Sequence, residues 1–190
     1  MTVAYIAAGA CVVLLVWTAF AFNALVSAHN RVNEAWSGID VQLKRRHDLV
    51  PNLVETVKAY AEHEHAVLRA VSDSRDNAAA SSGRRGRQAA EYELSQAIAG
   101  VRALSESYPE LRASEQFRRL QAQLAEIESE IQCARRIYNA NVQRFNARVR
   151  SFPGSLVRRL GGFRPTGYFE LSPVRRGGTA VSDPKKAAAA

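Results

Sequence analysis

Apolar residues dominate the start of the chain, where no charged side chain precedes Arg31. The stretch over residues 4–26 meets the length of about 20 residues that a helix needs to cross about 30 Å of hydrocarbon. Its second half carries three aromatic residues, Trp17, Phe20 and Phe22. Such side chains form belts where a helix meets the membrane interface. The pattern predicts a transmembrane helix over residues 4–26, preceded by a short extracytoplasmic N-terminus of residues 1–3.

A cleaved signal peptide is the alternative for this stretch, since Ala19-Phe20-Ala21 fits the small-x-small pattern of a cleavage site. The absence of Lys or Arg before the apolar core, and the length of that core, favour an uncleaved anchor. Positive charge follows the anchor, at Arg31 and residues 44–46, whereas the other side offers only the α-amine. The positive-inside rule then predicts a single-pass protein of the cell inner membrane, with the N-terminus outside and the C-terminal domain cytoplasmic.

From residue 32 onward, apolar residues recur at steps of four and three, the pattern of helices packed side by side at shallow angles. These seam positions are Val32, Trp36, Ile39, Leu43, Val50, Leu53, Val57, Tyr60, Val67 and Val71. Arg46 and Glu64 occupy two seam positions where apolar residues are expected. Each side chain either snorkels from the seam edge to water or belongs to a polar layer that sets the helix register or receives a partner.

Pro51 falls inside this pattern, where an interior proline costs about 3 kcal/mol or more. In the first turn of a new helix it costs little, and Asp48 is a candidate N-cap three residues earlier. We therefore expect the helix to be bent or broken near residues 47–51, and the sequence leaves open whether the chain reverses there. The second half of the pattern is expected to continue to Ala80, followed by an exposed loop over residues 81–87.

Two further helices are expected after this loop. One covers residues 88–104, with Pro109 ending or turning it. The other covers residues 117–149, where steps of three and four predict a helix about 50 Å long. Because short connections favour antiparallel neighbours, the fold class is all-α: a single N-terminal transmembrane helix plus an up-and-down antiparallel bundle over residues 27–171.

The sequence changes character after Arg150. A short amphipathic turn around Leu156 is framed by Pro153 and the pair Gly161-Gly162. Four aromatic residues there are expected to pack back on the bundle: Phe152, Phe163, Tyr168 and Phe169. Residues 172–190 contain Pro, Gly, Ala and charge with nothing to bury, which predicts a disordered basic tail.

Several short sequence motifs occur in a distinctive order along the chain. The first half contains NRV at 30–32, IDVQLKRR at 39–46, DLVPNLV at 48–54 and HE at 63–64. The second half contains YP at 108–109, YN at 138–139, FN at 145–146, SFP at 151–153 and GF at 162–163. Through these motifs the chain resembles the LemA family over about residues 15–170, although Phe22 stands where Tyr is usual in that family.

The resemblance implies a single N-terminal transmembrane helix, a short N-terminus outside and a cytoplasmic helical bundle, and it implies no known reaction. A branch of the family in magnetosome membranes points to membrane organisation by analogy only. The motif residues that we expect to be structural are Asn30, Arg31, Asp48, Pro51, Asn52, Glu64, Tyr138, Asn139, Phe145, Asn146, Phe152 and Pro153.

Sequence patterns for catalysis or metal binding are weak. His63 and His65 are two residues apart, which points them about 200° from each other on a helix, whereas ligand pairs need spacings of three or four. Gly161-Gly162 is better explained as a turn than as a phosphate loop, and no HExxH or nucleophile elbow occurs. Of the two cysteines, Cys11 lies in the apolar run and Cys133 in a helical pattern. We predict no catalytic, cofactor-binding or metal-binding residue, no cofactor and no enzyme.

Positive charge is concentrated in residues 131–190, which hold 12 of the 26 Lys and Arg residues and 2 of the 18 acidic ones. Candidates for contact with a protein partner or with anionic lipid are Lys44, Arg45, Arg46, Arg135, Arg136, Arg144 and Arg148. The alternative is a solvated face that balances Glu126, Glu128 and Glu130. Residues 44–46 lie up to about 30 Å beyond the anchor, well outside a Debye length of about 8 Å, so lipid attraction there is weak.

Two polar groups are expected to meet and to fix the bundle register. One is Asn139, Asn141 and Asn146 with Tyr138, and the other is Arg45, Asp48 and Asn52.

Taken together, the sequence predicts a membrane-anchored, non-catalytic scaffold or adaptor at the inner face of the membrane. Its expected partners are membrane lipid through the N-terminal helix and a protein, with a second copy of the chain as a further candidate; nucleic acid is not expected, because basic and aromatic residues do not interleave. The alternatives are an anionic-lipid-binding module that organises the membrane and an unrecognised enzyme.

Overall fold

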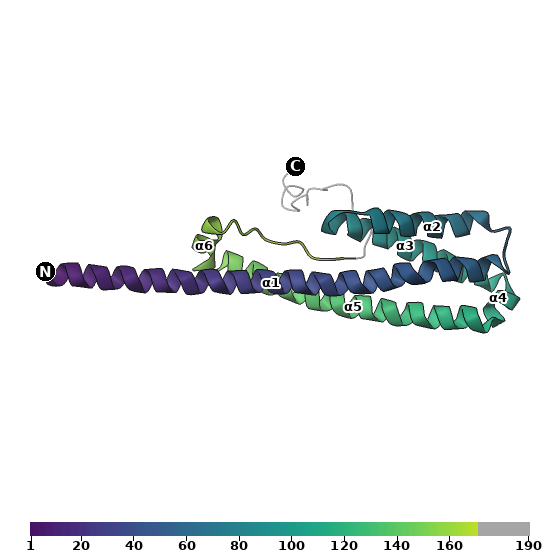
Figure 1. Ribbon diagram of the computed structural model, residues 1–190, viewed down its shortest axis with the longest axis horizontal. Coiled ribbons are helices and arrows are strands. Elements are labelled where there is room, and N and C mark those ends of the chain that lie inside the picture. Colours follow the sequence, from purple (N-terminus) through teal and green to yellow (C-terminus); the bar gives the residue numbers. More distant parts are fainter. Residues whose placement is uncertain (171–190) are drawn as a thin grey trace, which may run out of the picture.

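The computed structural model describes residues 1–170, and of residues 3, 4, 7, 159 and 160 only the backbone. Within residues 1–170 it holds helices and no strand (Figure 1). The helices are α1 (Thr2–Lys58), α2 (His65–Ala80), α3 (Gly83–Glu106), α4 (Pro109–Ala113), α5 (Glu115–Arg150) and α6 (Gly154–Leu160). The predicted all-α fold with a long apolar N-terminal helix is confirmed, while the tail predicted for residues 172–190 lies outside the described residues.

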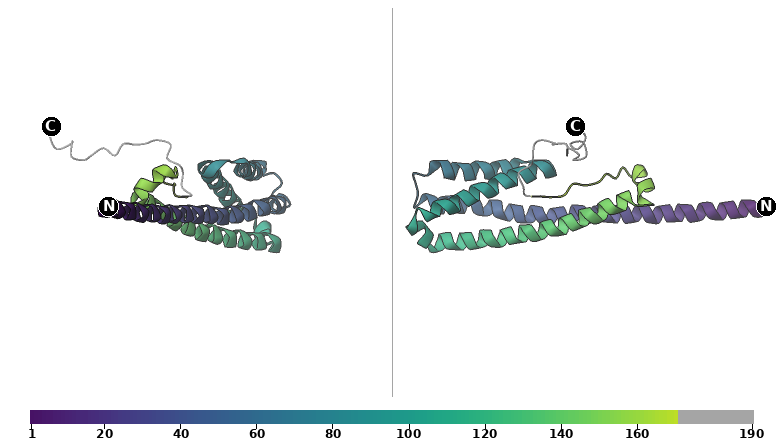
Figure 2. Two further views of the ribbon diagram at one scale, coloured as in Figure 1. Left: turned by 60° about the vertical axis from the view of Figure 1, so that its left-hand side comes forward. Right: turned by 180° about the vertical axis from the view of Figure 1, so that it is seen from behind.

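α1 is a single helix of 57 residues, about 85 Å long at 1.5 Å per residue. Its N-terminal part projects beyond all the other helices, as Figures 1 and 2 show. It contains an 18-residue window that is long and apolar enough to cross a membrane, and only 6% of that window is buried inside the protein. The large apolar side chains there are exposed, among them Ile6, Leu14, Leu15 and Phe20. α1 therefore provides the candidate membrane span that the apolar pattern predicted.

The predicted break near Pro51 is wrong, because α1 runs through this residue to Lys58. Pro51 lies on the exposed face of α1, whereas Val50, Leu53 and Val57 are fully buried on the other face. Burying each of these side chains stabilises the helix by about 1.5–3 kcal/mol, which together exceeds the roughly 3 kcal/mol cost of an interior proline. Tertiary burial thus overrides the local penalty, and Asp48 is a helix-interior residue rather than an N-cap.

The chain reverses after Lys58 instead, through residues 59–64. Val67 and Val71, which continue the seam in sequence, therefore belong to the antiparallel helix α2. The predicted loop over residues 81–87 is also wrong, because α3 already begins at Gly83 and only two residues separate it from α2. Gly83 has φ of +73°, a conformation that residues with a Cβ rarely adopt, and this allows so short a turn.

The bundle has two halves with separate cores. In the proximal half, nearer the apolar end of α1, helices α1 and α5 pack as an antiparallel pair and are joined by α6 and Phe169. In the distal half, the hairpin of α2 and α3 covers α1, and α4 leads into α5 (Figure 1). The helix predicted over residues 117–149 is confirmed as α5, which contributes to both cores.

After α6, residues 163–170 run back along the bundle in an extended conformation (Figure 2). Phe169 is fully buried and Phe163 packs against the proximal core, as predicted. Phe152 and Tyr168 remain exposed, and the ring of Phe152 lies against Trp17 of α1 rather than in either core.

Candidate functional site

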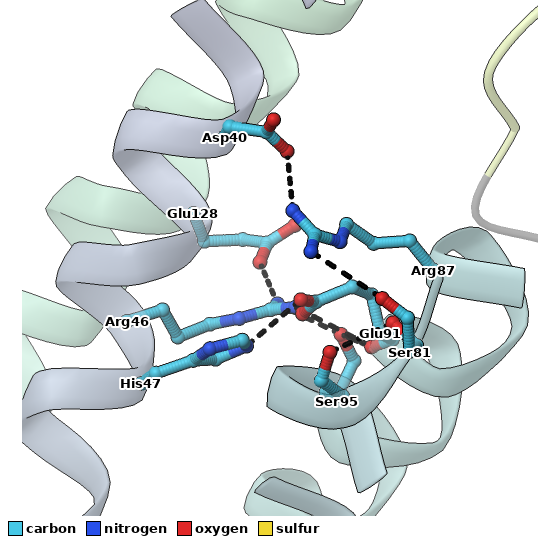
Figure 3. Close-up of polar contacts among 9 residues, drawn as sticks. Asp40, Arg46, His47, Ser81, Arg87, Glu91, Ser95 and Glu128 are labelled. Carbon is cyan, nitrogen blue, oxygen red and sulfur yellow. Dashed lines mark hydrogen bonds and ion pairs between the residues drawn. The ribbon is translucent and has the colours of Figure 1, made fainter. Parts of the chain in front are cut away.

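A buried ionic network joins three helices in the middle of the bundle (Figure 3). Arg46 on α1 is only 2% exposed and pairs with the carboxylate of Glu91 on α3, which is fully buried. The same guanidinium donates to Ser95 Oγ at 2.9 Å and to a carboxylate oxygen of Glu128 on α5 at 3.2 Å. The other oxygen of Glu91 lies 2.8 Å from His47 Nε2. The network therefore fixes α1, α3 and α5 at one level of the bundle.

The pKa of Glu91 reflects this environment. Burial raises the pKa of a carboxyl, but the hydrogen bond from His47 and the charge and hydrogen bond of Arg46 outweigh it. The pKa of Glu91 consequently lies below its ordinary value, and the carboxylate is ionised at neutral pH. Its oxygens are occupied by Arg46 and His47, so this carboxylate is engaged in structure rather than free to accept a substrate proton.

The network answers the question that the sequence left open for Arg46. Arg46 belongs to a buried polar layer, and its guanidinium is engaged by Glu91, Ser95 and Glu128. Glu91 was not predicted, although the sequence contains a signal for it. Glu91, Leu94, Ile98 and Val101 follow steps of three and four, so an acid occupies a core position of α3 just as a base does on α1.

A groove of about 330 Å³ opens beside this network on the side of the bundle. Its walls come from α3 and α5, because α3 packs mainly on α2 whereas α5 packs mainly on α1. The residues that line it are Arg46, Ser95, Ile98, Ala99, Arg102, Leu124, Ala125 and Glu128. The described residues form no group of three or more His, Cys, Asp or Glu side chains that could hold a metal ion.

A second arrangement of polar side chains lies on α5 and holds residues 163–170. The amide of Asn146 donates to Thr166 O and accepts from Thr166 N, both at 2.8 Å. Asn139 makes the same pair of bonds to Phe169, at 3.1 and 2.9 Å. Seven residues of helix rise about 10.5 Å, close to the length of three extended residues, so the two spacings match. We call Asn139 and Asn146 the asparagine clamp.

Aromatic side chains also hold the extended segment. The ring of Phe169 lies 5.4 Å from that of Trp36, and the ring of Phe163 lies 5.8 Å from that of Phe22. Tyr138 donates its hydroxyl proton to Gly167 O at 3.0 Å, and burial raises its pKa above the ordinary value. Each of these three α5 side chains therefore hydrogen-bonds backbone atoms of the extended segment, and Arg84 on α3 lies over the ring of Tyr138 at 5.8 Å.

The expected meeting of the two polar groups is wrong. Asn141 Nδ2 lies 3.5 Å from Arg31 O, and Arg46 pairs with Glu128, which fixes the antiparallel register of α1 and α5. In this register Asp48 lies near the level of residue 125, about 20 Å along α5 from Asn139 at 1.5 Å per residue. The asparagine clamp instead holds the C-terminal segment, a pairing that sequence periodicity does not report.

The other predicted contact residues lie mostly at the surface. Lys44, Arg45, Arg136, Arg144 and Arg148 are exposed. Arg135 is partly buried and stacks over the ring of Phe169 at 5.7 Å. Arg148 donates to the carbonyl oxygen of Ala24 at 3.1 Å, beside the apolar part of α1. The structure therefore separates the basic residues into a distal pair on α1 and a series along α5.

The remaining motif residues fall into two groups. Asn30, Arg31, Asp48, Pro51, Asn52 and Phe152 are exposed, whereas Phe145 is buried in the proximal core and Pro153 is half-buried. Glu64 accepts a hydrogen bond at 2.8 Å from the hydroxyl of Tyr108, whose pKa is raised by that bond. The YP motif at 108–109 and the HE motif at 63–64 are thus in contact, where the α1–α2 connection lies beside the α3–α4 connection.

The fold and these sites define a class of protein: an all-α bundle built on the extension of one candidate membrane-spanning helix. Residues 35–182 match the model of the LemA family, and the chain belongs to that family. It is 23% identical to the magnetosome protein MamQ of Magnetospirillum gryphiswaldense, over 86% of this chain and 69% of that protein. It is 22% identical, with the same coverage, to the magnetosome protein MamQ 2 of Paramagnetospirillum magneticum.

Proposed function

We propose that this LemA-family protein is a non-catalytic scaffold or adaptor, anchored in the inner membrane with its bundle on the cytoplasmic side. The observation that carries the proposal is the continuity of α1, which contains the candidate span and then supplies both cores of the bundle. A helix without an interruption holds the bundle upright at a fixed distance from the bilayer. Such a rigid connection suits a protein that places partners at a membrane surface.

Charge supports the orientation. No Lys or Arg occurs in residues 1–30, whereas Arg31, Lys44 and Arg45 follow the span and are exposed. Positive residues close to a span favour the cytoplasmic side. Digestion of intact spheroplasts with an external protease tests this point: the bundle should stay intact until the membrane is permeabilised, and cleavage beyond Arg31 in intact spheroplasts would reverse the orientation.

The exposed arginines of α5 indicate the chemistry of the protein partner. Arg136 and Arg144 lie on the surface of the proximal half, in a part of the chain that is rich in arginine and poor in acids. Complementary charge gives specificity and faster association in protein pairs. The partner that fits this surface carries acidic side chains.

Photocrosslinking in cells tests the adaptor function. A photoreactive residue at Ala140, which is exposed between the two arginines, should capture a partner, and Arg136→Glu with Arg144→Glu should abolish that capture. Arg118→Glu with Arg119→Glu, an exposed pair on the distal part of α5, is the matched control and should leave it intact. Equal capture by both double variants would contradict a charge-directed partner, and capture of only a second copy of this chain would indicate a homo-oligomer instead.

An anionic-lipid-binding module is the second candidate, and one observation favours it. Arg148 is bound to the backbone of α1 at Ala24, so its charge sits directly beside the candidate span, unlike Lys44 and Arg45. Native mass spectrometry of the full chain in detergent should then detect retained phosphatidylglycerol, and Arg144→Glu with Arg148→Glu should remove it. Retention of phosphatidylcholine to the same extent would exclude this candidate.

A further inference from the structure

α6 lies against α1 just where α1 leaves the bundle (Figures 1 and 2). The ring of Phe152, which precedes α6, is 5.3 Å from the ring of Trp17. Gly154 and Gly161 stand at the two ends of α6. A Cβ on Gly154 would overlap the carbonyl oxygen of Arg148 on α5 and would lie 3.3 Å from Cδ1 of Leu25 on α1. A Cβ on Gly161 would overlap the ring of Phe163 and would lie 2.9 Å from Cε2 of Phe22 on α1. The sequence thus brings α6 into close contact with the apolar end of α1.

The position of Arg148 limits how deep α1 can enter the hydrocarbon. Its guanidinium is hydrogen-bonded to Ala24 O, and a charged group is costly to place in the hydrocarbon region. The hydrocarbon must therefore end before Ala24. Residues 2–20 form about 28 Å of helix, which still matches a hydrocarbon thickness of about 30 Å. The inner interface then crosses α1 close to Trp17 and Phe20, four to seven residues before the Ala24 level.

This level coincides with exposed apolar side chains on α6 and its preceding turn. Phe152 is 69% exposed and Leu156 is 63% exposed, although both have large apolar side chains. Arg150 is exposed next to them. Aromatic residues at the interface and arginines at headgroup level are the pattern of a segment that lies in a membrane surface.

We propose that Phe152 and Leu156 insert into the inner leaflet of the same bilayer that α1 spans, with Arg148 and Arg150 at the phosphates of anionic lipids. This inference rests on the membrane anchorage proposed above and adds a second, interfacial contact to it. The exposed apolar face of Phe152 and Leu156 binds the lipid surface, because this face is continuous with the aromatic end of the span through the Trp17–Phe152 contact. The second contact fixes both the tilt of the bundle and its height above the membrane.

Fluorescence quenching of the full chain in proteoliposomes tests the proposal. In a background of Trp17→Phe and Trp36→Phe, checked for unchanged helicity by circular dichroism, single tryptophans replace Phe152, Leu156, Leu14 or Val41. Leu14 lies inside the span, and Val41 is an exposed apolar residue on α1 within the bundle, which makes it the matched control. Lipids brominated near the headgroup end of the acyl chain should quench Phe152→Trp and Leu156→Trp at least twofold, and Val41→Trp should be unaffected.

The outcomes separate this proposal from the anchorage on which it rests. Quenching of Leu14→Trp without quenching at positions 152 and 156 would overturn the interfacial contact and leave the span intact. Absence of quenching at Leu14→Trp by lipids brominated deep in the acyl chain would overturn the span itself and the contact with it. For the anionic headgroup, Arg150→Gln should weaken quenching of Leu156→Trp in phosphatidylglycerol vesicles, whereas Arg118→Gln should not. Equal quenching in phosphatidylglycerol and phosphatidylcholine, unaffected by Arg150→Gln, would overturn the assignment of anionic lipid.

Discussion

The proximal and distal halves of the bundle share α1 and α5 but hold them together in different ways. The proximal half packs the two helices directly and closes the core with aromatic rings and an extended segment held by the asparagine clamp. The distal half surrounds α1 with α2 and α3 and places the Arg46–Glu91 ion pair at the junction of the two halves. The distal half is thus registered by a buried ion pair, whereas the proximal half is closed by an extended segment that is held through side-chain to backbone hydrogen bonds.

Removing one partner of the ion pair should have the largest effect. Glu91→Ala leaves Arg46 buried without its main counter-charge, which costs about 3–5 kcal/mol of unfolding free energy. Denaturant unfolding of the full chain in detergent measures the loss, with the exposed neighbour Glu93→Ala as the control. The double variant Arg46→Met, Glu91→Leu should regain most of the stability, and a double variant as unstable as Glu91→Ala would contradict a register lock based on charge pairing.

Opening the asparagine clamp should have a smaller and more local effect. Asn139→Ala removes both hydrogen bonds to the backbone of Phe169, and each contributes about 0.5–1.5 kcal/mol net. Hydrogen exchange should accelerate at the amide of Phe169 and change little in α2 and α3. Gln143→Ala, an exposed substitution on the same helix, serves as the control. Uniform acceleration across both halves would show that the segment cannot detach independently.

Pro51→Ala should stabilise the distal half. It restores an α1 hydrogen bond on an exposed face, and an interior proline costs about 3 kcal/mol when its strain is not relieved. We expect a gain of about 1–3 kcal/mol in unfolding free energy, because the exposed site lets Ala replace Pro without disturbing the core. A loss of unfolding free energy in Pro51→Ala would contradict this prediction and would show that Pro51 stabilises the folded protein.

Acid should weaken the distal half by a modest amount. The pKa of Glu91 is lower in the folded protein than its ordinary value of 4.5, so the carboxylate stabilises the folded state above that pH. This stability is lost as the pH falls through the folded-state pKa. Unfolding midpoints between pH 3 and 7 should therefore fall more steeply for the natural protein than for Glu91→Gln, and parallel profiles would contradict the assignment.

The helices were largely predictable, because their patterns are local. The apolar end of α1 and the steps of three and four along α5 predicted the candidate span and the helix α5. Pro51 misled the prediction, because the burial of Val50, Leu53 and Val57 on the opposite face comes from tertiary packing. The reversal at residues 59–64 was missed because the seam continues across it in sequence.

The sites were less predictable, because they depend on register between distant segments. Arg46 and Glu91 each occupy a core position in their own helix, but they are 45 positions apart in the chain. Two reversals, after Lys58 and after Ala80, are needed to bring α3 to Arg46. The asparagine clamp could not be predicted for a different reason. Asn139 and Asn146 were recognised as polar residues late in α5, but their partners are backbone atoms of a segment that has no periodic pattern.

A distance measurement along α1 tests the central claim, that one uninterrupted helix is both anchor and bundle core. Spin labels at Phe20→Cys and Lys58→Cys, in a background of Cys11→Ser and Cys133→Ser, can be measured by pulsed electron resonance in bilayers. A continuous helix predicts one narrow distribution near ~57 Å, since 38 residues rise 1.5 Å each. A reversal at Pro51 would give about 36 Å, and a distribution centred there, or a broad one spanning both values, would contradict the account.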